Sequence, residues 1–276
     1  MHLSGLFIYP VKSLRGCPAP AAAVDALGLV GDRRFLVVDE SGRFLTQRTL
    51  PRMAQIATAL TADTLTLSAD SHGSIAVGRA SRPPSDPPRS ISVSVWRSEN
   101  LLADDCGNEA AAWLSSFLST PCRLVRIGAR FRRPVLKSAA QPGDVVSFAD
   151  AVPFLAISEA SLADLNDRLV ARGEDALPMN RFRPNLVIAG APAAFAEDKW
   201  PRVRIGEIVL RSAGPSARCA VTTTDQLTGE RGLEPLRTLA TYRRSPSDPT
   251  DVIFGQNLIH ETLSGSLRMG DTVTPL

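Results

Sequence analysis

Short strand-like segments recur along most of this chain, and they limit its fold more than any other feature of the sequence. Apolar and polar residues alternate at period two in Thr64–Ser68 and Ile91–Val95, as they do in half-buried β-strands. The proline-rich segment Arg79–Arg89 between them is expected to be a surface loop or a hairpin tip. Proline and glycine, at 21 and 19 residues, are spread over the chain, and helix interiors tolerate neither well. The sequence therefore predicts a mainly β fold with a few helices, of the α+β class.

Two segments have the periodicity of amphipathic helices. The apolar residues of Asn108–Leu118 fall on one stripe, and three leucines do the same in Ser158–Arg172. Ser161 and Asp164 are placed to form a capping box in the second helix, and Gly173 is placed to end it. Further strands are predicted at residues 3–9, 34–39, 122–127, 185–189, 203–212, 218–224, 252–261 and 271–274.

The length of the chain and the break after the first helix indicate two small domains. A chain of 276 residues is close to the size, about 250 to 300 residues, at which single hydrophobic cores stop growing. Ser-Thr-Pro follows the helix, and a new strand is expected from residue 122. We therefore expect one domain over residues 1–122 and a second over residues 123–276.

Charge, cysteines and histidines argue against several classes of protein. The 31 Lys+Arg and 28 Asp+Glu residues give a formal net charge of +3, which is a weak field. No apolar run approaches the roughly 18 residues of a membrane span, and the N-terminus lacks a secretion leader, so we expect a cytoplasmic protein without a membrane anchor. The cysteines are too far apart for a zinc ribbon or an iron–sulfur loop, and the three histidines are too scattered for a Ser-His-Asp triad.

Three basic segments are candidates for binding a polar ligand, and each also has an ordinary structural explanation. Lys12 and Ser13 follow the first strand and offer a charge and a donor to an anion, although a solvated basic turn is the alternative. In residues 32–35, strand alternation turns one arginine inward, where it needs a carboxylate or phosphate partner. An ion pair with Asp32 or Asp39 would also satisfy it. The arginines and asparagines of residues 180–185 suit a planar ligand or an ordinary turn.

Arg218 and Cys219 form the most informative pair in the sequence. A lone cysteine in a strand is usually a small buried hydrophobe. A neighbouring cation, however, favours the thiolate, which attacks electrophiles or binds soft metals. An extended strand would point the two side chains to opposite faces, so the arginine helps only if the backbone turns there. Gly214-Pro215 just upstream makes such a turn plausible.

A second basic cluster contains one aromatic residue, Phe131, whereas a nucleic-acid groove would interleave more of them. Aromatic residues make up only 5% of the chain, so binding of RNA or nucleotides is the weaker interpretation. A solvated face, or a docking patch for an acidic partner, is favoured for Arg123, Arg126, Arg130, Arg132, Arg133 and Lys137.

Several motifs in one order resemble the MOSC family of molybdenum-cofactor proteins, and within it the amidoxime-reducing component family. The motifs are Ile8-Tyr9-Pro10-Val11-Lys12-Ser13, Asp32-Arg33, Phe44-Leu45-Thr46-Gln47-Arg48 with Pro51-Arg52, Phe182-Arg183-Pro184-Asn185, Arg218-Cys219 with Thr222-Thr223, and Phe254-Gly255-Gln256-Asn257. The resemblance covers nearly the whole chain. It implies a β-barrel-like N-terminal domain packed on a MOSC β-barrel domain.

The resemblance also implies a site. It implies a molybdenum–molybdopterin cofactor, a pyranopterin dithiolene, with Cys219 as the catalytic residue and the ligand to molybdenum. A thiolate suits a soft metal site that dithiolene sulfur already binds. Relatives can carry hydroxyl residues at Ala151, Val152 and Ala217, so only main-chain contacts are expected there. The implied cofactor-binding residues are Lys12, Ser13, Arg33, Asp150, Ala151, Val152, Arg183, Asn185, Ala217, Arg218 and Cys219.

The function implied by the resemblance is reduction of N-hydroxylated substrates such as amidoximes, hydroxylamines or hydroxylated bases. Because the chain ends at Leu276 without the cysteines of a ferredoxin-like domain, no iron–sulfur cluster is expected in it. Electrons would then come from a separate flavin, haem or iron–sulfur protein. The partners expected are that protein and a small substrate, without nucleic acid. The alternative is a carrier of the cofactor, or a sulfur-transfer protein that uses Cys219.

Overall fold

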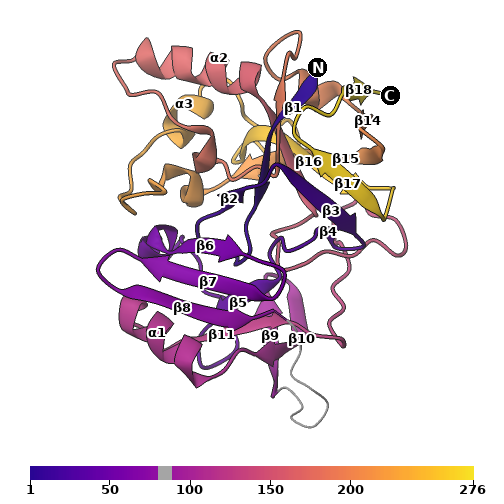
Figure 1. Cartoon of the computed structure of the whole chain (residues 1–276). Coiled ribbons are helices and arrows are strands. Elements are labelled where there is room, and N and C mark those ends of the chain that lie inside the picture. The colour runs from indigo at the N-terminus through magenta and orange to yellow at the C-terminus, as the bar shows by residue number, and fades with distance from the viewer. Residues whose placement is uncertain (80–88) are drawn as a thin grey trace.

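The computed structural model describes residues 1–79 and 89–276, and it consists of two lobes built mainly of strands (Figure 1). The larger lobe contains an eight-stranded sheet in the order β18-β14-β15-β16-β12-β13-β1-β2. Its strands are β1 (His2–Ile8), β2 (Cys17–Pro18), β12 (Phe154–Ser158), β13 (Leu186–Ala189), β14 (Arg202–Ile205), β15 (Ile208–Arg218), β16 (Val252–His260) and β18 (Val273–Pro275). The α+β fold class is confirmed.

Three smaller sheets complete the fold. One has the order β5-β11-β10-β9, the second β17-β3-β4 and the third β6-β7-β8. Their strands are β3 (Ala21–Asp25), β4 (Gly28–Leu29), β5 (Phe35–Val38), β6 (Ala57–Leu60), β7 (Thr64–Ala69), β8 (Gly73–Gly78), β9 (Ser90–Val95), β10 (Ser98–Asp105), β11 (Arg123–Ile127) and β17 (Gly265–Arg268). The helices are α1 (Asn108–Leu118), α2 (Glu159–Val170) and α3 (Leu236–Leu239), with 3₁₀ turns η1 (Pro51–Gln55), η2 (Met179–Arg181), η3 (Ala196–Lys199) and η4 (Ala220–Thr223).

The chain begins in the larger lobe and then crosses into the smaller one. Although β1 begins the chain, it pairs antiparallel with β13 in the large sheet. The chain then passes into the smaller lobe, where β5 pairs with β11. Because β11 directly follows residue 122, the first strand of the predicted second domain lies in a sheet with strands of the first. The boundary between residues 122 and 123 stays a prediction.

The structure corrects the bounds of several predicted elements. The predicted helix at Asn108–Leu118 is confirmed. The second helix begins at Glu159, and its cap is Ser158, whose hydroxyl accepts a hydrogen bond from the Ser161 backbone N–H, so the predicted capping box was wrong. The single strand predicted at residues 203–212 was also wrong, because a turn at Gly206 divides it into β14 and β15. Most of the predicted loop at residues 79–89 lies outside the described residues.

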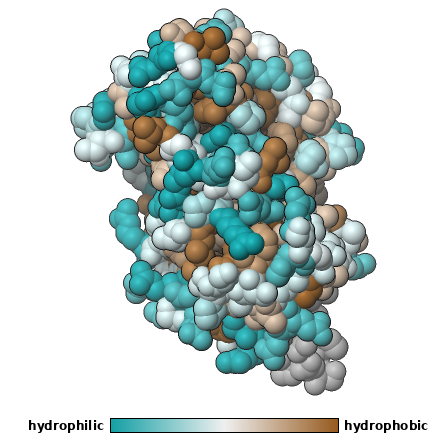
Figure 2. Space-filling model, turned by 90° about the vertical axis from the view of Figure 1, so that its left-hand side faces the viewer, coloured by the Kyte–Doolittle hydropathy of each residue, from teal (hydrophilic) through white to brown (hydrophobic). Residues whose placement is uncertain are grey.

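The hydropathy of the surface and the lengths of the helices bear on whether the protein contacts a membrane. On the face shown in Figure 2, hydrophilic residues predominate and hydrophobic residues form scattered small groups. Over the described ranges, none of the helices has the length and apolar character that crossing a bilayer requires.

Close packing at the centre of the large sheet leaves no room for a side chain at Gly255. Gly255 lies in β16 with φ +80°, and a Cβ atom there would approach Ile157 Cγ1 to 2.6 Å and the Ala156 carbonyl oxygen to 2.9 Å. Gly73, at φ +69°, has nothing within 4 Å of the same position. The two glycines therefore share a left-handed backbone and differ in crowding.

We predict that Gly255→Ala destabilises the protein more than Gly73→Ala does. Both substitutions place an L-residue at positive φ, at a cost of about 1–2 kcal/mol, and Gly255→Ala adds overpacking worth about 1–3 kcal/mol. Urea denaturation of the two variants measures the difference. Equal free energies of unfolding would contradict the packing argument.

Candidate functional site

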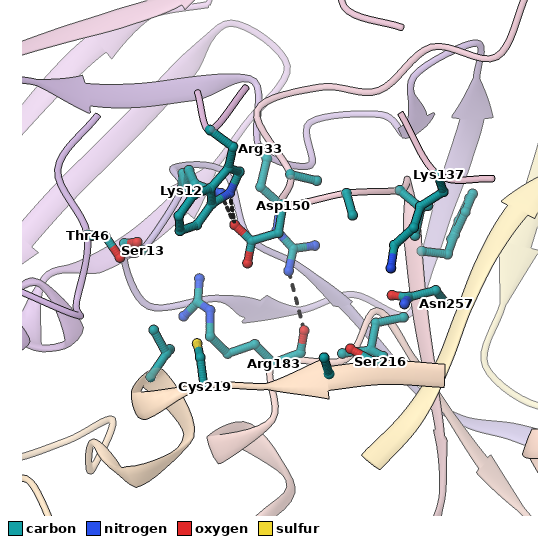
Figure 3. A pocket seen from close by; sticks show the side chains of 18 of the residues that line it. Lys12, Ser13, Arg33, Thr46, Lys137, Asp150, Arg183, Ser216, Cys219 and Asn257 are labelled. Carbon is teal, nitrogen blue, oxygen red and sulfur yellow. Dashed lines mark hydrogen bonds and ion pairs between the residues drawn. The ribbon is translucent and has the colours of Figure 1, made fainter. Parts of the chain in front are cut away.

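A cavity of about 610 Å³ lies at the junction of the lobes, within the size range of small-molecule sites. Segments from both halves of the chain line it (Figure 3). Among the described residues, its only lining acid is Asp150, and its lining cations are Lys12, Arg33, Arg48, Arg97, Arg133, Lys137, Arg183 and Arg218. Eight cations against one carboxylate suit a ligand with negative charge.

Every residue that the sequence analysis singled out for the site lines this cavity. These residues come from the loop after β1, the turn before β5, the loop before β12, the start of β13 and the end of β15. They are Lys12, Ser13, Arg33, Asp150, Ala151, Val152, Arg183, Asn185, Ala217, Arg218 and Cys219. The structure thus brings them together, while their individual roles stay predictions.

Lys12 is buried in the cavity wall. Its side chain is only 6% exposed, and Nζ pairs with the carboxylate of Asp150, so the alternative of a solvated basic turn was wrong. Burial lowers the pKa of Lys12 to about 8, although the charge of Asp150 opposes this shift. The Asp150 side chain is 67% exposed, and the Lys12 charge together with hydrogen bonds from Lys12 and Trp96 holds its pKa well below the usual range. At neutral pH the pair is therefore ionised.

Arg33 and Arg183 both pack against the ring of one tyrosine. Their guanidinium carbons lie 4.2 Å and 4.4 Å from the centre of the Tyr9 ring. Arg33 Nη1 also donates to Asp32 Oδ2 at 2.7 Å and to Asn185 Oδ1 at 3.0 Å. Of the two predicted ion-pair partners, Asp32 is therefore the correct one for Arg33. The predicted alternation at residues 32–35 was wrong, because φ is +46° at Arg33 and β5 begins only at Phe35.

Strained backbone is concentrated at the cavity. Four lining residues other than glycine have positive φ, namely Ser13 at +67°, Arg33 at +46°, Trp96 at +55° and Arg183 at +56°. Such conformations cost on the order of 1–3 kcal/mol each and persist where the surrounding structure fixes them, which is common at functional sites. Here the positive φ angles occur in the segments that place Lys12, Arg33 and Arg183 in the wall of the same cavity.

The thiol of Cys219 faces the cavity from the end of β15. Cys219 is half-buried and precedes the 3₁₀ turn η4, so the strand predicted at residues 218–224 was wrong beyond Arg218. The hydrogen bond to its sulfur comes from the smaller lobe, since Arg48 Nε donates to Sγ at 3.3 Å. Arg48 itself stacks on Trp96 with 4.2 Å between the guanidinium carbon and the ring centre.

Arg218, the sequence neighbour of Cys219, binds the protein backbone instead. Its Nη2 donates to the Phe182 carbonyl oxygen at 2.6 Å, and its Nη1 donates to Ser216 Oγ at 2.9 Å. Burial lowers the pKa of Arg218. Within the described part of the chain, buried Arg218 Nε has no hydrogen-bond partner, so a donor remains for a ligand.

Sequence reasoning missed lining residues whose positions depend on long-range packing, among them Arg48, Trp96, Lys137 and Asn257. It also misjudged the basic cluster of residues 123–137 as one solvated face or docking patch. Arg126 and Arg133 are in fact buried. Arg133 Nη1 donates to the Ser147 carbonyl oxygen at 2.8 Å, and Nη2 donates to that of Asp150 at 3.0 Å, so Arg133 shapes the cavity wall.

The fold and the site together define a two-lobed, mainly β protein with a cysteine thiol in a cation-rich cavity between the lobes. Comparisons with known proteins specify this class further. Residues 1–121 match the MOSC N-terminal beta barrel domain, and residues 143–274 match the MOSC domain. The chain belongs to the MOSC family, in the two-domain form with both modules.

Several named relatives share most of the chain. The human mitochondrial amidoxime-reducing component 1 is 38% identical over 286 residues, covering 97% of this chain and 81% of that protein. The mitochondrial amidoxime reducing component 2 of Macaca fascicularis is 35% identical, with 97% and 81% coverage. The molybdenum cofactor sulfurase of Danio rerio is 33% identical over 297 residues, covering 99% of this chain and 34% of that protein.

We predict that the cavity of the purified protein binds sulfate more weakly as the pH rises through about 8. Sulfate keeps its charge over this range, whereas Lys12 loses its proton, because its pKa is about 8. Losing a charge-assisted hydrogen bond of about 1.5 kcal/mol or more weakens binding roughly tenfold. Calorimetric titration from pH 6.5 to 9.5 measures the affinity.

Two lysine variants test this origin of the pH dependence. Lys12→Met should bind sulfate weakly at every pH, while Lys199→Met, at an exposed position in η3, should follow the wild type. A wild-type affinity that stays level through pH 8 would exclude Lys12 as the titrating group.

Proposed function

We propose that this protein is a molybdenum-dependent oxidoreductase that reduces N-hydroxylated compounds such as amidoximes, hydroxylamines and hydroxylated bases. The observation that carries the proposal is the thiol of Cys219, which faces a cavity with eight lining cations and one lining acid. The names of the relatives that share 97% of the chain, amidoxime-reducing components, support the same activity.

The residues of the cavity fit a molybdenum–pyranopterin cofactor in three respects. A cysteine offers a thiolate, which is a preferred ligand for a soft metal site. Lys12, Arg33 and Arg183 offer the charges that a phosphate group requires. The orphaned Nε of Arg218 offers a buried donor that a ligand would satisfy. Ala151, Val152 and Ala217 lack polar side chains, so only their main-chain groups would take part.

In this proposal the protein positions the cofactor and the substrate. The bound cofactor would supply two-electron redox chemistry with acceptance of the N–O oxygen. Cys219 would fix the metal at the end of a rigid strand, and Arg48 would hold the sulfur by its hydrogen bond. Trp96 covers the same end of the cavity, since its ring stacks on Arg48 and its Nε1 donates to Asp150 Oδ1 at 3.0 Å.

The proposal includes a separate electron donor. Reduction of each N–O bond consumes two electrons, which a flavin, haem or iron–sulfur protein would deliver. These relatives are named as components, which is consistent with a system of several proteins. We also propose a cytoplasmic location and no iron–sulfur cluster within this chain.

A second candidate function is a non-catalytic carrier of the cofactor or a sulfur-transfer protein. The similarity to the molybdenum cofactor sulfurase of Danio rerio, over 99% of this chain, favours it. Such a protein would lose molybdenum to an apo-molybdoenzyme on mixing, or pass a persulfide from Cys219, and would show no reduction of amidoximes.

We predict that Cys219→Ala abolishes reduction of benzamidoxime with a chemical electron donor. Because substituting a mere outer-shell partner of a metal ligand typically costs about 10–100-fold, loss of the ligand itself should cost more. Molybdenum per protein, measured by elemental analysis, should fall in parallel. Cys17→Ala is the matched control, since Cys17 is a half-buried free cysteine in β2 outside the set that lines the cavity. Full turnover by Cys219→Ala would refute the ligand assignment.

A further inference from the structure

Two polar side chains lie at an end of the cavity where none of the predicted cofactor-binding residues was expected to bind a ligand. Figure 3 shows Lys137 and Asn257 at the end away from Cys219, with Asp150 between. Lys137 belongs to the loop that follows β11, and Asn257 belongs to β16. Both line the cavity.

Lys137 is a cation without a protein partner. Six of the eight lining cations make hydrogen bonds or ion pairs, and they are Lys12, Arg33, Arg48, Arg133, Arg183 and Arg218. Among the described residues, the Lys137 ammonium makes neither, although the residue is half-buried. The chain has only three lysines, Lys12, Lys137 and Lys199. The Lys137 ammonium therefore remains available to an acceptor group of a ligand in the cavity.

Asn257 offers the complementary group. The residue is 9% exposed, and its Nδ2 donates to the Pro215 carbonyl oxygen at 3.1 Å, which fixes the orientation of the amide. Its Oδ1 makes no hydrogen bond within the described part of the chain. An amide oxygen without a protein donor can accept from an N–H group of a ligand, and an ammonium can donate to an acceptor oxygen. The two side chains therefore suit a planar heterocycle whose edge carries a carbonyl oxygen beside an N–H group.

Strand β15 sets the separation between this end and the sulfur. Asn257 is bonded to Pro215, and Cys219 follows four residues later along the same extended chain. At about 3.3 Å per residue, the backbone of Cys219 lies at most roughly 13 Å from that of Pro215, because the register shift between Pro215 and Ala217 shortens the path. A ligand that reaches both ends must span a comparable distance. A small N-hydroxylated substrate that reacts beside the sulfur would not extend so far.

We propose that Lys137 and Asn257 recognise the outer edge of the pterin ring of the cofactor whose metal Cys219 binds. The carbonyl oxygen of that edge accepts from Lys137, and the adjacent ring N–H donates to Asn257 Oδ1. This inference rests on the proposed function. An N-hydroxylated base as substrate has an edge of the same chemistry, so the experiment separates the two sources.

The test measures retention of the cofactor and not turnover. Wild type, Lys137→Met, Lys137→Arg and Asn257→Leu are produced in a host that makes the cofactor, and pterin fluorescence after oxidation and molybdenum per protein are followed during dialysis. Lys137→Met should lose pterin about tenfold faster than the wild type, as expected for a lost charge-assisted hydrogen bond. Lys137→Arg, which keeps the cation, should restore part of the retention. Lys199→Met is the matched control and should behave as the wild type.

Each other outcome also decides the proposal. If Lys137→Met and a folded Asn257→Leu retain pterin as the wild type does, the proposal is overturned. If they retain pterin while KM rises for a hydroxylated base and not for benzamidoxime, the edge belongs to the substrate and the proposal is likewise overturned. Should Asn257→Leu fail to fold, Lys137→Met alone carries the test. A wild type that keeps the cofactor but reduces nothing would refute the proposed function and leave this inference standing.

Discussion

Positive charge enclosed at the junction of two lobes is the constraint on which the rest of this structure depends. Burial lowers the pKa of Lys12 to about 8 and that of Arg183 to about 10, so the fold holds both cations at a free-energy cost. Asp150, the only acid among the described lining residues, cannot balance eight cations. An anionic ligand would reduce this cost, and the same charges that destabilise the ligand-free protein would then stabilise the complex.

The cavity exists only because the chain crosses between the lobes. Strand β1 is paired within the large sheet, and the turn after it carries Lys12 to the surface where the lobes meet. The smaller lobe contributes Arg48, which donates to Cys219 Sγ of the larger. Nearby, Gln47 and Gln226 exchange buried hydrogen bonds of 3.1 Å and 3.0 Å across the same junction. The position of the sulfur relative to its cation therefore depends on how the lobes are docked, and neither lobe alone would contain the site.

Periodicity in the sequence predicted local elements such as helix α1 well. It failed at segments whose backbone conformation depends on tertiary contacts. Helix α1 has the predicted bounds because its apolar stripe is sufficient to specify it. The stretch after Arg218 has strand-like composition, with valine and threonines, yet it forms a 3₁₀ turn, since this turn presents Cys219 to the cavity. The side chain of Arg33 does not follow the predicted strand alternation, because its backbone has a positive φ. The predicted site residues were found through motifs. Arg48 also lies in one of those motifs, but its contact with Cys219, like the position of Lys137 in the cavity wall, depends on three-dimensional packing.

Arg218, the sequence neighbour of Cys219, makes no hydrogen bond to the Cys219 sulfur among the described contacts, because its guanidinium is bound elsewhere. Arg218 donates to the Phe182 carbonyl oxygen and to Ser216, so its guanidinium is held against the wall of the cavity. The cation at the sulfur must then come from another segment, and Arg48 reaches it from the opposite lobe. Cys219 directly follows β15, and Asn257 is hydrogen-bonded to Pro215 within that strand, so β15 connects the thiol end of the cavity to its polar end. The cations that both lobes contribute give the space between these ends its positive charge.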